Sequence, residues 1–448
     1  MTPQQLIETI QQSPQQKIKV AITDIDGVLR GKYIHKDKFL SAAESGFGFC
    51  NVVFGWDCAD TCYDNGAYTG WHTGYPDAEA VIDLSTYRQV PWDHDVAFFL
   101  ADFSAGEQPL AVCPRTLLKQ IIGRAQAAGY HAEFGLEFEF FHFSESAQSL
   151  YNKQFTNLEP LTPGMFGYSL LRAGQNRDYF NALMDELGAF NVPIEGLHTE
   201  TGPGVIEAAI LHSSALEAAD RAVLFKSSTK EIASRFGMTA TFMAKIDEQL
   251  PGCSGHLHQS LWDAAGQKNL FHDDSDADQM SATFKHYLAG QLHCMSEILP
   301  LYAPTVNSYK RLVEGMWAPT LATWGVDNRT AALRAITGGA KSSRLETRVG
   351  GADINPYLAV AAALASGLWG IEQKLELKED AVSGNAYQAQ GRTRLPRNLL
   401  EATEKMAASD IAKTLFGVDH FVRTRLWEWQ QYERSVSSWE RQRYLEII

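Results

Sequence analysis

Residues 354–371, INPYLAVAAALASGLWGI, carry no charged side chain, and this limits the folds open to the chain more than any other feature. A helix of this composition is either a membrane span near its lower length limit or a helix covered by protein on every side. Ala, Gly and Ser are frequent in it, Pro356 suits a first helical turn, and the charged run EQKLELKED follows directly. We therefore predict a helix in the core of a large domain, and no membrane partner.

The composition excludes some classes of partner. Hydrophobic residues make up 45% of the 448 residues and charged residues 21%, which is typical of globular proteins and allows two domains. The formal net charge of −14 argues against a nucleic-acid partner but not against a nucleotide substrate. The six cysteines show neither a CxxC pair nor zinc-ligand spacing, and the polar start carries no secretion signal. These features predict a cytoplasmic protein.

Local patterns divide the chain near residue 105. Alternating and aromatic runs predict a small strand-rich domain over residues 1–105, followed by the linker-like SAGEQP. The remainder, residues 106–448, mixes helical and strand patterns and forms the second predicted domain. The predicted helices cover 113–129 and 214–237, and the predicted strands cover 133–143, 238–246 and 256–262.

Three of the strand-like segments place chemically active residues two apart, on one face. They hold Glu137 and Glu139, then His256, His258 and Ser260, then Arg344, Glu346 and Arg348. A fourth segment, HTETGPGVIEAAI, brings Glu200 and Glu207 to either side of a Gly-Pro-Gly turn. Any one row alone also fits an ion-pair ladder on an exposed strand.

Taken together, the rows supply carboxylates and an imidazole, which suit hard divalent cations such as Mg²⁺ or Mn²⁺. Arginines are available beside them for the charge neutralisation that phosphoryl transfer needs. These arginines are Arg311, Arg329, Arg334, Arg344 and Arg348. The P-loop signature GxxxxGK[ST] and the nucleophile signature GxSxG do not occur in the sequence.

The same segments resemble the glutamine synthetase family, in that family's order. The matching stretches are TDIDGVLRGK, GLEFEFF, HTETGPGVIE, ATFMAK, GCSGHLHQSLWD, APTVNSYKRLVEGM, DNRTAALR and SSRLETRVGGADINPYLA. The resemblance implies an α+β fold, with a small β-grasp-like N-terminal domain and a catalytic domain whose curved antiparallel sheet is backed by helices. It also implies a homo-oligomer of stacked rings, a dodecamer being the expected size, with active sites between adjacent subunits.

The resemblance further implies a role for each motif residue. One metal site resembles Glu139, Glu200 and Glu207, and the other resembles Glu137, His256 and Glu346, holding two or three Mg²⁺ or Mn²⁺ ions in all. Glutamate binding is expected at Arg311, Gly252, Arg348 and Glu139. Transferred-phosphoryl contacts are expected at Arg329 and Arg348, and nucleotide contacts at His258, Ser260, Arg334, Lys341 and Arg344. The resemblance also places His212 near the expected nucleotide, where some relatives have an aromatic ring.

The implied reaction uses ATP to phosphorylate the γ-carboxylate of L-glutamate, after which a nitrogen nucleophile displaces phosphate. The expected ammonium site departs from the glutamine-forming pattern. Trp317 stands where those members have a flap glutamate, and Cys50, Val53 and Met165 replace polar pocket residues. Only Glu200 remains as charge partner and candidate base.

Ammonium is strongly hydrated and needs carboxylates to offset its desolvation, whereas an apolar wall favours an organic substituent. We therefore predict a γ-glutamylamide synthetase, related to the polyamine-using branch, that prefers an alkyl or aryl monoamine. The alternatives are a glutamine synthetase that tolerates Trp317, and a non-catalytic structural or regulatory relative.

Overall fold

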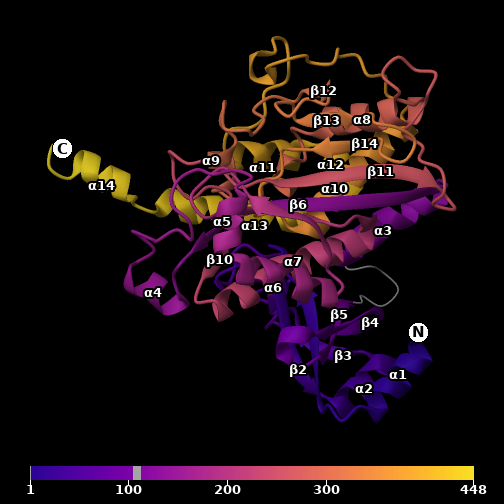
Figure 1. The fold of residues 1–448 in the computed structure, drawn as a ribbon, viewed down its shortest axis with the longest axis vertical. Coiled ribbons are helices and arrows are strands. Elements are labelled where there is room, and N and C mark those ends of the chain that lie inside the picture. Colours follow the sequence, from indigo (N-terminus) through magenta and orange to yellow (C-terminus); the bar gives the residue numbers. More distant parts are fainter. Residues whose placement is uncertain (1, 104–111) are drawn as a thin grey trace.

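A five-stranded sheet forms the N-terminal part of the computed structural model, which describes residues 2–103 and 112–448 (Figure 1). Its strand order is β2-β1-β5-β4-β3, with β1 parallel to β5 and the other neighbours antiparallel. The strands are β1 (Lys17–Thr23), β2 (Leu29–His35), β3 (Phe47–Cys50), β4 (Asp77–Val90) and β5 (Val96–Phe103). Helices α1 (Pro3–Gln12) and α2 (Lys36–Ser45) and the short helices η1 (Asn51–Phe54) and η2 (Pro91–Asp93) accompany them. Gly27, at φ +82°, lies in the turn between β1 and β2.

The larger sheet carries the candidate site. Within the described residues its order is β12-β13-β14-β11-β6-β8-β7, and the short β9 and β10 also pair with β6. Its strands are β6 (Tyr130–Phe143), β7 (Ile194–Thr199), β8 (Val205–Ile210), β9 (Ser213–Ser214), β10 (Thr239–Thr241), β11 (Gly255–Asp263), β12 (Trp324–Val326), β13 (Leu333–Ile336) and β14 (Arg344–Thr347). Neighbours are antiparallel except for β12 and β13. The long strands β6 and β11 lie at its centre (Figure 1).

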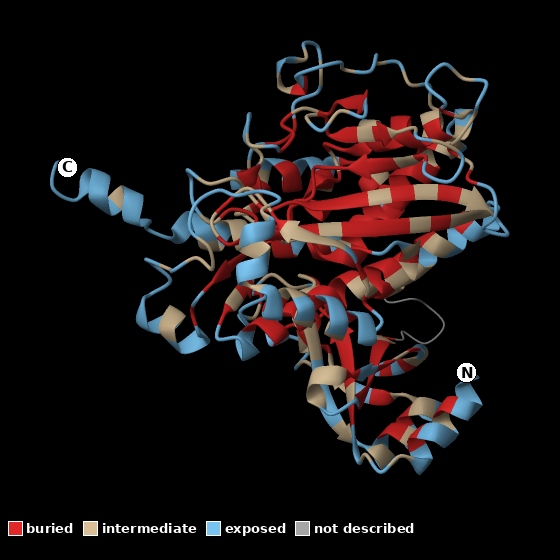
Figure 2. Cartoon of the chain, viewed as in Figure 1, coloured by how far each residue is buried: buried red, intermediate tan, exposed pale blue. Residues whose placement is uncertain are grey.

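In the part of the chain that the structure describes, four helices back this sheet and pack on one another: α3 (Pro114–Ala127), α7 (Ala215–Arg235), α8 (Ala282–Cys294) and α10 (Pro356–Glu372). Every residue of α10 from Pro356 to Leu368 is buried, which confirms the predicted core helix (Figure 2). Gly290 of α8 allows close contact with α10, because a Cβ there would lie 2.2 Å from the Ser366 carbonyl oxygen. Among the described residues, no helix is long and apolar enough to cross a membrane.

The remaining helices lie around this frame, and α14 extends away from the body at the C-terminal end (Figure 1). They are α4 (Ala147–Asn152), α5 (Leu170–Gln175), α6 (Arg177–Ala189), η3 (Leu299–Leu301), α9 (Ser308–Arg311), η4 (Ala386–Gln388), α11 (Leu399–Ala408), α12 (Asp410–Phe416), α13 (Asp419–Arg434) and α14 (Ser438–Tyr444).

Two strand predictions were too long. The predicted strand 238–246 pairs with β6 only over β10. Beyond Thr241 the chain leaves the sheet, because Phe242 turns into the core, stacking 4.9 Å from Phe140, and β6 pairs with β11 from Phe138 to Tyr130. The Arg344–Glu346–Arg348 row also outlasts its strand, since β14 ends at Thr347. The predicted domain boundary at 105/106 lies outside the described residues, so the division into 1–105 and 106–448 stays a prediction.

Candidate active site

The polar rows meet on one face of the larger sheet, where β8, β6, β11 and β14 lie side by side. Antiparallel register sets Glu207 opposite Glu139, His256 opposite Glu137, and His258 opposite Glu346. On the other face Phe138 and Phe140 pack against Phe225 of α7. A cavity of about 800 Å³ opens on the polar face. The alternation read from the sequence is therefore what gathers the carboxylates.

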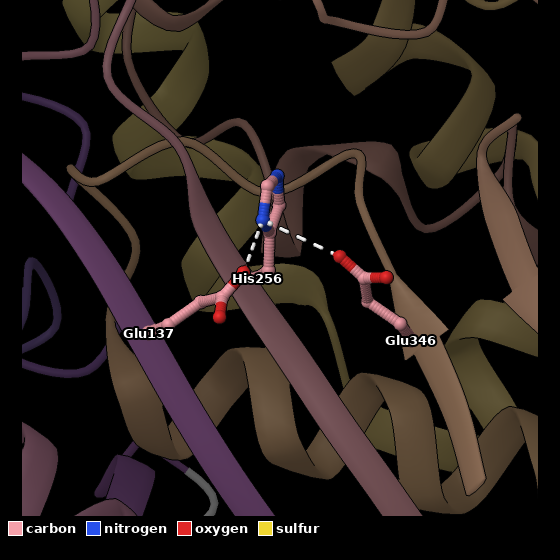
Figure 3. A group of neighbouring side chains, drawn as sticks. All are labelled: Glu137, His256 and Glu346. Carbon is pink, nitrogen blue, oxygen red and sulfur yellow. Dashed lines mark hydrogen bonds and ion pairs between the residues drawn. The ribbon is translucent and has the colours of Figure 1, made fainter. Parts of the chain in front are cut away.

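Glu137, His256 and Glu346 form one group, which we call the strand cluster (Figure 3). His256 Nδ1 lies 2.8 Å from Glu137 Oε1 and 3.5 Å from Glu346 Oε1. Arg348 pairs with Glu346, and Arg334 Nη1 lies 2.9 Å from Glu346 Oε2. Burial alone would raise the pKa of Glu346, but His256 and Arg348 outweigh it and hold the pKa at about 2. The charge of Glu346 is therefore offset by Arg334 and Arg348.

His198, Glu200 and Glu207 form a second group, the hairpin cluster, with ligand atoms within 4.8 Å of one another. It is built by the β7–β8 hairpin, whose turn needs glycine at Gly204 (φ +72°), where a Cβ would lie 2.5 Å from the His142 carbonyl oxygen. The predicted Gly-Pro-Gly turn thus brings Glu200 and Glu207 together. Sequence reasoning missed His198, although its position two residues before Glu200 was a usable signal.

The hairpin cluster is crowded by like charge. Burial raises the pKa of Glu207, and the neighbouring Glu137, Glu139 and Glu200 carboxylates raise it further, to about 9. Glu139, predicted to share a metal with Glu200 and Glu207, faces Glu207 in register, but its Oε2 accepts a hydrogen bond from the Ser254 amide at 2.6 Å.

The donor set fits divalent cations. Carboxylate oxygens with imidazole nitrogens suit Mg²⁺ or Mn²⁺, and cations would relieve the repulsion around Glu207. Within the described ranges, His256 Nε2 and Arg348 Nε are buried without a hydrogen-bond partner. Such unpaired polar atoms are costly in a closed core and common where a ligand binds. The predicted metal ligands that line the cavity are Glu137, Glu139, Glu200, Glu207, His256 and Glu346.

The residues expected to hold phosphoryl groups and nucleotide also line this cavity: Arg329, Arg334, Lys341, Arg344, Arg348, His258 and Ser260. Arg344 Nε donates to His258 Nδ1 at 3.2 Å, and Ser260 Oγ accepts from Trp262 Nε1 at 2.9 Å. Cationic side chains therefore adjoin the strand cluster, as a metal-bound polyphosphate requires.

Arg311 and Gly252, expected to bind glutamate, are in contact with each other. Arg311 is 1% exposed and donates to Ser254 Oγ and to the carbonyl oxygens of Val349 and Arg348. A Cβ on Gly252 would lie 2.6 Å from Arg311 Cγ, so this close approach requires glycine. Gly252 lines the cavity, whereas Arg311 is not among the described residues that do so.

The predicted acceptor residues are dispersed. Trp317 lines the cavity with its side chain exposed and φ at +57°. Met165, Cys50 and Val53 are not among the described lining residues: Met165 is half exposed, and Val53 is buried in the N-terminal core. Cys50, in β3, donates its thiol to the Tyr75 carbonyl oxygen at 3.3 Å.

Tyr168, which sequence reasoning missed, lines the cavity instead of Met165. Its ring stacks on His198 with a centroid distance of 4.3 Å. Its backbone amide donates to the Thr199 carbonyl oxygen at 2.7 Å, which holds the ring over the hairpin cluster. The stretch MFGY offered a signal, since it places a second aromatic residue three positions after Met165.

Comparison with known proteins decides the family. The family model described as "Glutamine synthetase, catalytic domain" matches residues 111–444. The chain belongs to the glutamine synthetase family. The Type-1 glutamine synthetase 2 of Dictyostelium discoideum is 55% identical over 96% of this chain and 84% of its own length.

Two further relatives in this family are amine ligases by name. The glutamate–isopropylamine ligase of a Pseudomonas species is 39% identical, over 96% of this chain and 95% of its own length. The gamma-glutamylethanolamide synthetase of Streptomyces coelicolor is 36% identical, over 96% of this chain and 92% of its own length. Among solved structures, the GmaS/ADP complex superposes with a TM-score of 0.85 at 27% identity, over 98% of this chain and 99% of that one.

These similarities confirm the predicted α+β fold of the glutamine synthetase family, with its curved sheet backed by helices, and a resemblance to the γ-glutamylamide branch. The chain is an ATP-dependent ligase of this family. Glutamine synthetase family enzymes use ATP and Mg²⁺ or Mn²⁺, and the two clusters described above match that requirement.

Proposed function

We propose that the enzyme joins the γ-carboxylate of L-glutamate to a small organic amine through γ-glutamyl phosphate, releasing ADP and phosphate. An alkyl or aryl monoamine is the favoured acceptor. The observation that carries this choice is the aromatic lining of the cavity, where Tyr168 stacks on His198 of the hairpin cluster and Trp317 lines the same cavity. The amine ligases among the relatives support the proposal.

In the first step a γ-carboxylate oxygen of glutamate attacks the γ-phosphorus of ATP, and the bond to the ADP oxygen breaks. Arg348, which pairs with Glu346, and Arg329, which lines the same cavity, would contact the transferred phosphoryl oxygens. Arg334, Arg344 and Lys341 would hold the rest of the polyphosphate. Bound divalent cations would supply the remaining charge neutralisation. The residues that would hold them are Glu137, His256 and Glu346 on one side and Glu139, Glu200 and Glu207, with His198, on the other.

In the second step the amine nitrogen attacks the acyl-phosphate carbon, a C–N bond forms, and phosphate leaves with the bonding electron pair. The attacking nitrogen must lose a proton. Glu200 faces the cavity beside Tyr168, and we propose it as the base that takes this proton. Arg311, beneath Gly252, would help to hold glutamate once the substrate displaces part of its present hydrogen bonding.

The proposed acceptor preference follows from the side chains that line the cavity. Glu314, the carboxylate nearest to Trp317 in sequence, is not among the described residues that line the cavity. Met316, Trp317 and Tyr168, which line the cavity, offer ammonium little compensation for its lost hydration. The same side chains stabilise an organic substituent by ~25 cal/mol for each Å² of apolar surface buried.

The test is a phosphate-release assay with glutamate, ATP and Mg²⁺, comparing ammonium with alkyl and aryl monoamines at equal concentration. Product mass identifies the amide, and omission of glutamate controls for simple ATP hydrolysis. We expect at least one monoamine to turn over faster than ammonium. Faster turnover with ammonium than with every amine would overturn the proposal.

The 55% identical relative favours a second candidate, a glutamine synthetase that uses ammonia. The same assay separates the two. The non-catalytic alternative predicts no magnesium-dependent ATP turnover with any acceptor. A complete set of predicted metal ligands around one cavity argues against it.

Assembly into stacked rings, with a dodecamer as the expected size, belongs to this proposal. Cys50 and Val53 would then approach an active site only from an adjacent copy. Light scattering of the purified protein would measure the size of the assembly. The cytoplasmic location also stays a prediction.

A further inference from the structure

The end of the cavity away from the metal clusters contains a carboxylate held between two imidazoles. His212 Nδ1 lies 3.1 Å from Glu133 Oε2, and His131 Nε2 lies 2.8 Å from Glu133 Oε1. Glu133 and His212 both line the cavity. Because an ionised carboxylate only accepts hydrogen bonds, each imidazole donates to it, and Glu133 fixes the rotamer and tautomer of both rings.

We propose that Glu133 is a positioning residue for nucleotide binding, which holds the His212 ring as a stacking platform for the base. The proposal rests on the use of ATP proposed above. It assigns to Glu133 and His131 a task that none of the metal, phosphate or acceptor residues performs.

The geometry of β6 sets the distance between Glu133 and the metal-binding residues. His131, Glu133, Gly135 and Glu137 alternate along β6 and share its cavity face. Glu133 lies four residues from the metal-cluster residue Glu137, which is roughly 13 Å along a strand. This separation is comparable with the span from the terminal phosphates of ATP to its base. Gly135 lies between the two and adds no side chain, so the floor of the cavity stays open.

Chemistry explains why His212 needs a partner. Its side chain is 67% exposed, just beyond the end of β8, and it would sample several rotamers if it were untied. Aromatic faces bind bases of any sequence by stacking, and they do so better when the ring is already ordered. His131 donates a hydrogen bond to one oxygen of Glu133, and His212 donates to the other. The two bonds together fix the Glu133 carboxylate and, through it, the His212 ring.

The experiment compares the binding of MgADP and of magnesium pyrophosphate by calorimetry, using the full-length protein. Pyrophosphate reports the phosphate contacts alone, whereas ADP adds the nucleoside. For Glu133→Gln we expect MgADP affinity to fall about fivefold to tenfold and pyrophosphate affinity to change less than about twofold. The matched control is Glu186→Gln, which removes a carboxylate from a surface ion pair with Arg235.

A double-mutant cycle tests whether Glu133 acts through His212. Glu133→Gln in the His212→Ala background should weaken MgADP no further than His212→Ala alone. His131→Ala, a smaller disturbance, should lower MgADP affinity about twofold to threefold. In turnover, KM for ATP should rise in Glu133→Gln while kcat and KM for glutamate stay at wild-type values.

Three outcomes would overturn the inference: an unchanged MgADP affinity in Glu133→Gln, an equal loss for ADP and pyrophosphate, or additive effects in the double mutant. Additivity would mean that Glu133 contacts the nucleotide directly. A wild-type protein that binds no adenine nucleotide would overturn the proposed function itself, which separates the two failures.

Discussion

The strand cluster and the hairpin cluster lie on the same sheet and contain the same kinds of side chain, yet their electrostatics are opposite. Glu346 of the strand cluster is paired with Arg334 and Arg348, and its pKa is held at about 2. Glu207 of the hairpin cluster is buried among other carboxylates, and its pKa is raised to about 9. At neutral pH Glu346 is therefore ionised, whereas Glu207 is protonated.

The difference shows which of the two clusters the protein stabilises without bound metal. Buried ion pairs hold the strand cluster in place before any ligand binds. Removing one partner of such a pair is costly, because the other charge stays buried without compensation. The hairpin cluster is assembled by backbone, through the Gly204 turn and the β7–β8 pairing, against the repulsion of its own side chains. We infer that bound divalent cations stabilise the hairpin cluster by relieving its repulsion. In the strand cluster they would bind to side chains that ion pairs already hold in place.

Glu346→Gln should have the largest effect. We expect turnover to fall about a thousandfold or more, because a metal ligand and the partner of two arginines are lost together. In EDTA the free energy of unfolding should fall by about 3 kcal/mol, since Arg348 and Arg334 keep their buried charges. Urea denaturation followed by circular dichroism measures the second effect.

The control for that variant is Glu372→Gln, which breaks an exposed pair with Arg124 at 3.4 Å. Its unfolding free energy should stay within about 0.5 kcal/mol of wild type. If Glu346→Gln proved as stable as this control in EDTA, the strand cluster would not be held together by its own cations.

Glu207→Gln should lower turnover about a hundredfold and yet stabilise the metal-free protein. Because the folded-state pKa of about 9 exceeds the ordinary value of 4.5, the native protein binds more protons than the unfolded chain between these values. Wild-type stability in EDTA therefore falls as pH rises through this window. Glutamine does not ionise, so the stability of the variant does not fall in this way. Its free energy of unfolding should exceed that of wild type by about 1 kcal/mol or more at pH 8. Urea midpoints at pH 6 and pH 8 check the sign.

Mg²⁺ affinity should depend on pH through the hairpin cluster. Ion binding needs the ionised Glu207, so each ion bound there releases close to one proton below a pKa of about 9. The apparent Kd should fall by up to about tenfold for each pH unit between 6 and 9. Calorimetry in two buffers of different ionisation enthalpy counts the protons. A slope that Glu207→Gln leaves unchanged would assign the proton to another group.

The parts of the site that followed from sequence are those fixed by strand alternation and turns. The rows containing Glu137, His256 and Glu346 needed only the two-residue period of a strand, and the Gly-Pro-Gly turn needed only glycine's freedom at positive φ. The buried helix α10 followed from its lack of charge.

The parts that sequence reasoning missed depend on long-range packing. Tyr168 reaches the hairpin cluster only because its loop bonds to Thr199 at the end of β7. No local period encodes that contact. The expected role of Arg311 in glutamate binding stays a prediction, and its burial beneath Gly252 comes from tertiary packing that the motif does not encode. Loop closure and burial of this kind depend on the whole fold and not on the motif.

Trp317→Glu should have the smallest effect, and it tests the proposed acceptor preference at a residue that lines the cavity. A carboxylate there would offset part of the desolvation of ammonium, so kcat/KM for ammonium relative to the best amine should rise about tenfold. The backbone at Trp317 has φ +57° in the wild type, and the new side chain meets the same local strain. The measurement is a competition assay with both acceptors present and amide products resolved by mass.

Trp317→Phe is the matched control, since it keeps an aromatic wall without adding charge, and its preference should stay within about twofold of wild type. If both variants kept the wild-type ratio, the acceptor would be selected elsewhere, and Tyr168 over His198 would be the next residue to change. If Trp317→Phe alone shifted the ratio towards ammonium, wall area and not charge would determine the choice. In that case packing would select the acceptor. The difference in charge between the two clusters would then affect metal binding and not the choice of acceptor.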